Sequence, residues 1–150
     1  MQAGRRYLLK AGLMFTAIAA IPRSLLAAAW PEAAFKSSDA SGAMMELFGA
    51  EQPTPSDRIA LEVPTIAENG AVVPVEVSTT LEGVESISIV VENNPRPLAA
   101  TFELAPEVVP TIESRIKMGQ TSNVTAVVKT SEGLFSVTKE VKVTIGGCGG

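Results

Sequence analysis

The sequence predicts a mainly β protein: one antiparallel β-sandwich of about seven strands, preceded by a helical segment. Three observations favour this fold class. The chain has 150 residues, of which 46% are apolar and 19% are charged, and this is enough for one domain with a sizeable core. From residue 59 onward, apolar residues recur with a period of two, as in strands with one buried face. Turn residues separate these runs at the spacing typical of a sandwich.

The first 29 residues are predicted to be a cleaved twin-arginine signal peptide. Arg5 and Arg6 precede an apolar run at residues 11–21, and small residues follow up to Ala29. This pattern is typical of an export signal, and the run is shorter than the roughly 20 residues of a membrane-spanning helix. An uncleaved membrane anchor or a buried helix is the alternative. The expected location is the periplasm of a bacterium.

Cleavage after Ala29 would leave 121 residues with 8 basic and 16 acidic side chains. Such an acidic surface repels nucleic acid and anionic lipid. We therefore expect no nucleic-acid partner, and no membrane association after the signal has been removed. Because the twin-arginine route exports proteins that have already folded, a protein partner acquired before export is a further expectation.

Residues 30–52 are predicted to form an N-terminal helical segment. Pro31 suits a first helical turn and Gly49 suits a helix end, while Ser41 and Gly42 weaken the middle. We expect one helix with a possible break at residues 37–42. The apolar residues that follow helical spacing are Ala34, Phe35, Met44, Met45, Leu47 and Phe48. The two methionines are interpreted as packing residues, because methionine adapts well to irregular interfaces.

Residues 53–145 are predicted to form the sandwich domain, which we expect to be immunoglobulin-like. The antibody-type pair of cysteines around a tryptophan is missing, so the core must be aliphatic. The turn Glu68-Asn69-Gly70 predicts a hairpin between the first two strands, and Pro74 predicts an edge strand or a bulge. The expected strands are residues 59–63, 73–77, 87–91, 98–104, 112–118, 124–128 and 135–145.

Apolar residues also occupy the second face of several strands, notably Val72, Val90, Val127 and Leu134. One explanation is that the sandwich and its helix cover both faces. The other is a partner surface, because exposed apolar patches usually mark an interface. The sequence leaves both explanations open.

The composition excludes most catalytic chemistry. The chain has no histidine and one cysteine, so it lacks histidine-dependent nucleophiles, imidazole metal ligands, internal disulfides and thiolate metal clusters. Glu76, Glu92, Glu103 and Glu140 each lie on the polar side of an expected strand, where solvent explains them better than acid catalysis does. We predict no catalytic residue, no metal site and no cofactor.

The last five residues, Gly146-Gly147-Cys148-Gly149-Gly150, are predicted to form a flexible arm, because glycine loses the most conformational entropy on ordering. From Gly146 to Cys148 the arm would reach about 10 Å beyond the fold. No basic residue lies near Cys148 in sequence to stabilise its thiolate. A thiol of this kind suits a group that other enzymes act on. The alternatives are an incidental cysteine or a site of covalent dimerisation.

Four segments of the chain carry a family resemblance. The C-terminal segment is VKVTIGGCGG (residues 141–150), and the other three are IAENGAVVPV (66–75), VENNPRPL (91–98) and RIKMGQTSNV (115–124). Together they resemble the SoxY family, the sulfur-carrier subunit of the bacterial thiosulfate-oxidising Sox system, and the C-terminal motif is intact. The resemblance covers nearly all of the chain after the predicted signal, and the signal itself agrees with it.

The resemblance implies an immunoglobulin-like carrier, itself not an enzyme, that pairs with a smaller all-β SoxZ subunit in the periplasm. The resting form could be a heterodimer or a heterotetramer linked through two Cys148 residues. In this family the cytochrome pair SoxAX joins thiosulfate oxidatively to the carrier cysteine, and SoxB removes the terminal sulfone as sulfate. The remaining sulfane sulfur is then oxidised by SoxCD or passed on to another acceptor. Cys148 would be the attachment site.

Two other functions compete with the carrier hypothesis. The first is a periplasmic interaction module whose terminal thiol forms intermolecular disulfides. The second is an enzyme that uses carboxylates. Substitution of Cys148 separates the three, because only a carrier requires this thiol for loading with substrate.

Overall fold

The computed structural model describes residues 30–50 and 52–144. The predicted signal peptide and the five-residue arm therefore lie outside the described residues. The chain divides into two compact units between Trp30 and Pro31, and every described helix and strand belongs to the second. None of the described helices has the length and apolar content that crossing a membrane requires.

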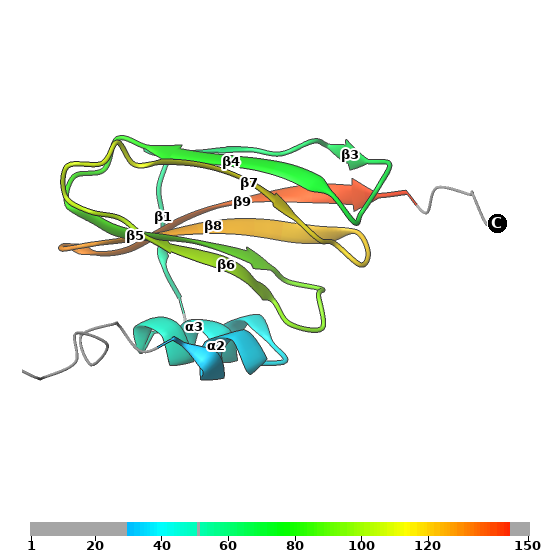
Figure 1. The fold of residues 1–150 in the computed structure, drawn as a ribbon, viewed down its shortest axis with the longest axis horizontal. Coiled ribbons are helices and arrows are strands. Elements are labelled where there is room, and N and C mark those ends of the chain that lie inside the picture. The colour runs from blue at the N-terminus through cyan, green and yellow to red at the C-terminus, as the bar shows by residue number, and fades with distance from the viewer. Residues whose placement is uncertain (1–29, 51, 145–150) are drawn as a thin grey trace, which may run out of the picture. The chain divides into compact units, whose positions relative to one another are not determined.

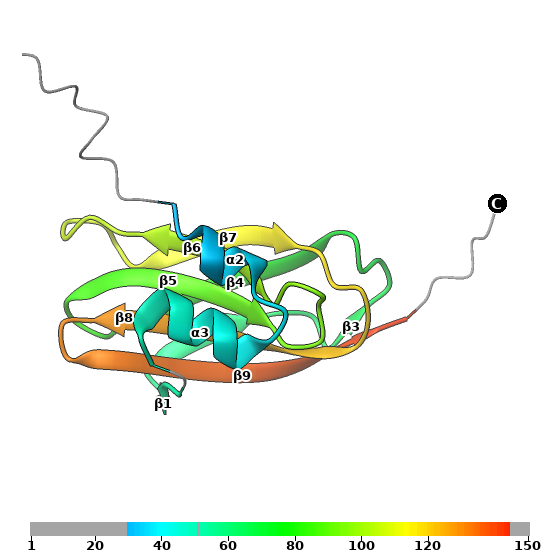
Figure 2. The same ribbon diagram turned by 90° about the horizontal axis from the view of Figure 1, so that it is seen from below.

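The second unit is a β-sandwich with a pair of helices on one outer face, and this confirms the predicted fold class (Figure 1). The larger sheet has the order β1 (Thr54–Pro55), β9 (Gly133–Val143), β8 (Ser122–Thr130), β5 (Val84–Val91) and β6 (Leu98–Glu103), and β3 (Ile66–Ala67) also pairs with β9. The smaller sheet has the order β2 (Ile59–Glu62), β4 (Val73–Thr79) and β7 (Thr111–Ile116). The helices α2 (Glu32–Lys36) and α3 (Ala40–Phe48) lie across the outer face of the larger sheet (Figure 2).

The larger sheet is buried on both faces over its central strands. Its inner face packs against the smaller sheet in an aliphatic core that includes Ile87, Ile89 and Val128. Its outer face packs against the helices, where Val90 and Val127 are 4% and 1% exposed. Two-sided burial explains why both faces of these strands are apolar in the sequence.

The packing of the helices decides between the two explanations for the apolar second-face residues, and the answer differs from residue to residue. Val90, Val127 and Leu134 belong to the cluster beneath the helices, so intramolecular packing explains them. Val72 does not, because half of its side chain is exposed. It precedes β4, at the end of the sandwich where β9 also ends.

The N-terminal segment forms two helices, separated by Ser37–Asp39. The second helix begins after Asp39, because the Asp39 carboxylate accepts a hydrogen bond from the backbone N–H of Gly42 at 2.7 Å and so caps the N-terminus of α3. Gly49 ends α3 as predicted, with a left-handed φ of 69° and its N–H bonded to the carbonyl oxygen of Met45. The sequence placed the break region correctly but did not show that Asp39 begins a new helix.

The hairpin predicted at Glu68–Gly70 is wrong. The turn forms, but it joins β3 to β4, and these strands lie in different sheets. β2 and β4 do pair antiparallel, with Leu61 opposite Val77, although the chain between them first passes along β9. Turn residues in a sequence indicate that the chain reverses direction, but they do not indicate which sheet the next strand joins.

The edge strand or bulge predicted from Pro74 is also wrong, since β4 is the central strand of the smaller sheet and its register with β7 is regular through Pro74. The short length of β2 explains how the proline is tolerated there. The pairing between β2 and β4 stops at Glu62 and Glu76, whereas Pro74 pairs only with Arg115 of β7. The missing N–H therefore faces no neighbouring strand.

The described residues form nine strands, two more than the sequence predicted. The additional strands, β1 and β3, have two residues each and pair parallel with β9. A segment of two residues has no detectable period, so alternation could not reveal them. The remaining strand pairs are antiparallel, and the seven predicted strands are all present.

The smaller sheet places three glutamates in one row across its outer face. Glu76 lies opposite Glu62 on one side and opposite Glu113 on the other. Like charges in opposed positions destabilise a sheet by roughly 0.2–1 kcal/mol per pair. We predict that Glu76→Gln raises the free energy of unfolding by about 0.5 kcal/mol at low salt, as measured by urea denaturation.

Glu140→Gln is the matched control, because Glu140 is opposite the neutral residue Asn123. Removal of its charge should leave stability unchanged. A Glu76→Gln protein no more stable than this control would contradict the assignment of strain to the glutamate row.

Candidate functional site

The predicted site residues Cys148, Gly146, Gly147, Gly149 and Gly150 lie outside the described residues. The structure instead describes the end of the sandwich that leads to them, as far as Thr144. We call this end the tail root. It consists of residues 141–144 at the end of β9, β3 with the following turn (66–72), and the loops 92–97 and 117–121.

The end of β9 is hydrogen-bonded on both sides. On one side, the backbone N–H groups of Lys142 and Thr144 donate to the carbonyl oxygens of Thr65 and Ala67, at 3.0 and 3.1 Å. On the other side, the N–H of Val143 donates to the side-chain oxygen of Thr121 at 3.0 Å. Three successive amides are thus satisfied in alternating directions, so the position from which the chain continues toward Cys148 is fixed by the fold.

Two asparagines join the loops of the tail root. Asn94 donates from Nδ2 to the carbonyl oxygen of Lys117 at 2.7 Å, and its Oδ1 accepts from the N–H of Gly119 at 3.1 Å. Asn93 donates from Nδ2 to the carbonyl oxygen of Thr121 at 2.9 Å. These bonds place Thr121, whose hydroxyl then holds the end of β9.

Gly70 lets the turn after β3 pack closely against the other parts of the root. Its carbonyl oxygen accepts a hydrogen bond from the N–H of Met118 at 2.7 Å. A side-chain Cβ at this position would overlap the carbonyl oxygen of Met118 and would lie 2.9 Å from Cγ1 of Val143. Glycine is therefore required here by a close approach of backbone and side chain.

The four segments on which the SoxY resemblance was based meet at the tail root. Segments 66–75, 91–98 and 115–124 contribute the turn and the two loops, and segment 141–150 begins at the end of β9. The sequence identified the segments but not their contacts, because the interacting residues are 22 to 28 positions apart. Gly70 was predicted as part of a turn, and nothing in the sequence indicated the contacts of Asn93 and Asn94.

Four carboxylates that the sequence assigned to the polar sides of strands are exposed in the structure. Glu76, Glu92, Glu103 and Glu140 are all exposed, as predicted, and a working acid or base requires a shielding environment. A groove of about 590 Å³ on the outer face of the smaller sheet is lined by Glu62, Glu76 and Glu113 among others. Within the described residues, no group of three or more acidic, histidine or cysteine side chains is placed to hold a metal ion.

The geometry defines a class of protein: an immunoglobulin-like sandwich whose last strand is hydrogen-bonded on both sides just before the chain continues toward its cysteine. The family model described as "Sulfur oxidation protein SoxY" matches residues 44–148, a range that includes Cys148. The structure is also similar to that of the sulfur carrier protein SoxY from Chlorobium limicola f thiosulfatophilum. That match has 38% identity and a TM-score of 0.61, over 69% of this chain and 94% of the other. The chain belongs to the SoxY family of sulfur oxidation proteins.

More distant likenesses concern the fold alone. A superoxide reductase (neelaredoxin) from Ignicoccus hospitalis aligns with a TM-score of 0.55 over 65% of this chain and 98% of the other, at 19% identity. A single-residue variant of the same reductase aligns with a TM-score of 0.52 over 70% and 90% of the two chains, at 17% identity. A comparison with curated protein sequences gave no match.

We predict that Gly70→Ala destabilises the protein by about 1–3 kcal/mol, as overpacking of a tight site does. The added methyl group would push the 117–121 loop and Val143 away from the turn. Thermal denaturation measures the effect. Gly119→Ala is the control, because a Cβ there would meet only Oδ1 of Asn94, at 3.9 Å; equal losses from the two variants would contradict the packing at Gly70.

We also predict that Thr121→Val loosens the end of β9. The substitution keeps the shape of the side chain but removes the acceptor for the N–H of Val143, which costs about 1 kcal/mol. Hydrogen exchange of the Val143 amide should become about fivefold faster, while Thr121→Ser, which retains the hydroxyl, should exchange like the natural protein. Unchanged exchange in Thr121→Val would show that this bond does not hold β9.

Proposed function

We propose that the protein is a sulfur carrier that holds thiosulfate-derived groups covalently on Cys148 and presents them to successive enzymes in the periplasm. One observation supports this proposal most directly: the SoxY family match extends through Cys148, the only cysteine of the chain. The Chlorobium relative, described as a sulfur carrier, supports the same role.

The proposed loading step is an oxidation. The thiol of Cys148 loses its proton, the outer sulfur of thiosulfate bonds to the cysteine sulfur, and two electrons leave to a cytochrome partner: Cys–SH + S₂O₃²⁻ → Cys–S–S–SO₃⁻ + H⁺ + 2e⁻. Hydrolysis then releases the sulfone: Cys–S–S–SO₃⁻ + H₂O → Cys–S–S⁻ + SO₄²⁻ + 2H⁺. Both products on the cysteine are persulfide-type species, which are reversible, whereas direct oxidation to sulfinic or sulfonic acid would end the cycle.

In this proposal the partner enzymes supply the chemistry and the carrier supplies a tethered thiol. SoxAX would load Cys148, SoxB would hydrolyse the sulfone, and SoxCD would oxidise the remaining sulfur. A SoxZ-like subunit would accompany the carrier. No basic residue adjoins Cys148 in sequence to activate the thiol, which suits a group that is acted upon.

The fold supports such a role mechanically. The hydrogen bonds around Lys142, Val143 and Thr144 fix the start of the tail, while the four glycines around Cys148 leave the tail without bulky side chains. We propose that residues 146–150 act as a flexible arm that enters the channel of a partner enzyme. Tethering would keep each intermediate at high local concentration near the sandwich.

We predict that Cys148→Ser abolishes loading without affecting the fold. The natural protein, incubated with thiosulfate and the oxidising cytochrome partner, should gain the mass of one S₂O₃ group on the peptide that contains Cys148, and reductant should remove it. Cys148→Ser should gain none. Glu107→Gln, which retains the thiol and all four glycines and changes an exposed residue between β6 and β7, is the control and should load.

Thiosulfate turnover by Cys148→Ser at the natural rate would overturn the proposal. A natural protein that forms only disulfide-linked dimers, and takes up no thiosulfate, would instead favour the interaction module.

A further inference from the structure

The position of Cys148 limits where a partner enzyme is able to sit. Thr144 is fixed by β3, and Cys148 follows it four positions later in the chain, a reach of about 13 Å when fully extended. An enzyme that acts on Cys148 inside a channel must therefore bring the rim of that channel close to the tail root. This limit on the partner's position rests on the proposed function. The charges and the apolar side chains of the tail root then determine which kind of channel rim would fit against it.

The tail root is basic, although the protein as a whole is acidic. Arg96 and Lys117 lie in its loops, and Lys142 lies near the end of β9. Arg115 lies just outside the root, near the end of β7, where it lines the same groove as Glu76 and Glu113. All four side chains are exposed. Within the described residues, the two ion pairs involve other lysines, Lys36 and Lys129. The three charges at the root and that of Arg115 beside it are thus available to a partner.

Acidic residues at the root are fewer and partly engaged. The turn after β3 contains Glu68 and the 92–97 loop contains Glu92. Oε2 of Glu92 accepts a hydrogen bond from Nδ2 of Asn123 at 2.9 Å. Within the residues that define the root, three basic groups against two acidic ones leave a local excess of one positive charge.

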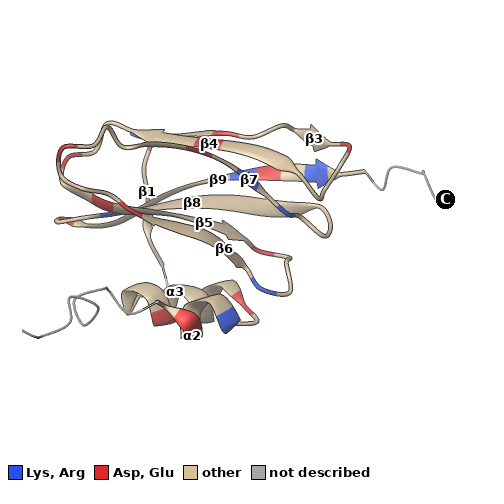
Figure 3. Ribbon diagram, viewed as in Figure 1, with Lys and Arg blue, Asp and Glu red and all other residues tan. Residues whose placement is uncertain are grey.

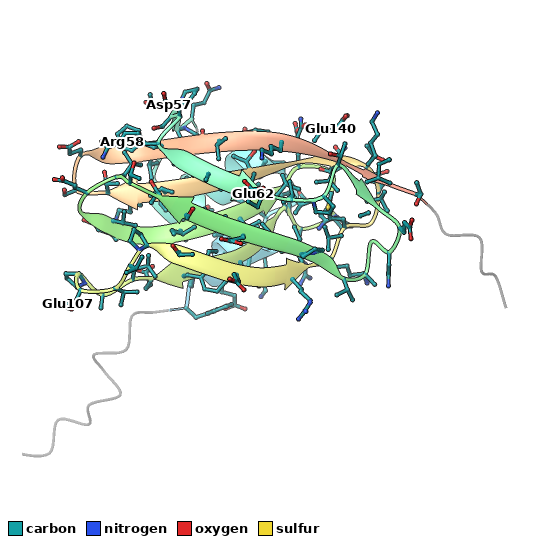
Figure 4. The ribbon with its side chains drawn as sticks, turned by 90° about the horizontal axis from the view of Figure 1, so that it is seen from above. Asp57, Arg58, Glu62, Glu107 and Glu140 are labelled. Carbon is teal, nitrogen blue, oxygen red and sulfur yellow. The ribbon has the colours of Figure 1, made fainter. Side chains whose placement is uncertain are left out.

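The opposite end of the sandwich has the reverse balance (Figure 3). Its loops and strand ends contain two basic residues, Arg58 and Lys129, and six acidic residues: Asp57, Glu82, Glu85, Glu103, Glu107 and Glu132. Figure 4 shows Asp57, Arg58 and Glu107 at this end, away from Glu140 on β9. Lys129 pairs with Glu85 at 2.8 Å, and this hydrogen bond raises the pKa of Lys129 above its ordinary value.

Two exposed apolar side chains lie among the basic residues of the tail root. Ile66 on β3 is 56% exposed and Val72 is 50% exposed, and Ile66 is the register partner of Lys142. The helices that cover the other second-face residues do not cover Val72. Apolar side chains beside exposed charges are typical of protein interfaces, which have an apolar centre and a polar rim.

We propose that Ile66, Val72, Arg96, Arg115, Lys117 and Lys142 form a docking surface for a protein partner whose contact surface is acidic around an apolar centre. The partner is an enzyme that acts on the group held by Cys148, and the acidic rim surrounds the entrance to its active site. The positive root and the negative opposite end would also orient the carrier with Cys148 foremost, since complementary charge steers diffusional encounter.

The first test reverses charge at the root and, separately, away from it. Lys117→Glu/Lys142→Glu is compared with Lys36→Glu/Lys129→Glu, which changes the net charge equally but lies on α2 and at the far end of β8. Melting curves confirm that both variants fold. With the carrier as the varied substrate of the loading enzyme at low salt, the root variant should lose about tenfold in kcat/KM, with kcat unchanged and a weaker salt dependence. The control should behave like the natural protein.

The second test removes apolar surface. Ile66→Ser should raise the KM of the carrier several-fold, whereas Val109→Ser should not, although Val109 is 75% exposed in the loop between β6 and β7. Equal kinetics for root and control variants in both tests would overturn the docking surface.

A third measurement distinguishes a partner from the anionic cargo. Tetrathionate reacts with the thiolate without an enzyme: Cys–S⁻ + S₄O₆²⁻ → Cys–S–S–SO₃⁻ + S₂O₃²⁻. This rate should be nearly equal in the root variant and its control. A root variant that is slowed as much with tetrathionate as with the enzyme would show that the charges attract the anion, and this would overturn the partner assignment. If the natural protein is never loaded by the enzyme, the proposed function fails instead.

Discussion

The rest of the structure depends on one set of hydrogen bonds, those made by residues 142–144 at the end of β9 and just after it. Lys142 and Thr144 bond to the segment around β3, and Val143 bonds to Thr121. Thr121 is placed by Asn93, and the turn after β3 is placed by the close contact of Gly70 with Met118 and Val143. Segments distant in sequence thus cooperate to fix one point on the surface. A tethered thiol delivers its group reproducibly only when its tether begins at a fixed point.

The remainder of the fold makes that point rigid. β9 pairs with β8 from Gly133 to Val141, and β8 and β5 are buried between the smaller sheet and the helices. Val141, one residue before the hydrogen-bonded end, is fully buried opposite Ser122. Displacement of the tail root would therefore disturb a close-packed core, which yields little to strain.

The sequence predicted most of the architecture, because alternation over five or more residues reveals a strand and because Gly49 and Asn-Gly signals reveal ends and turns. It failed where the outcome depends on distant partners. Pro74 suggested an edge, but the short length of β2 makes a central position possible. The turn at Glu68–Gly70 suggested a hairpin, but β3 first pairs with β9. Cys148 stood out as the only cysteine, whereas Thr121, Asn94 and Gly70 gave no sign of their positioning role, since their partners lie in other loops.

The central claim is that the end of the sandwich that leads to Cys148 is where enzymes meet the carrier. A hydrogen-exchange footprint of the carrier bound to its loading enzyme tests this claim most directly. The account predicts that amides in residues 66–72, 92–97 and 117–121 become protected in the complex, while those in the loops at 80–83 and 104–110 exchange as in the free protein. Protection confined to the loops at the opposite end, with an unchanged tail root, would contradict it.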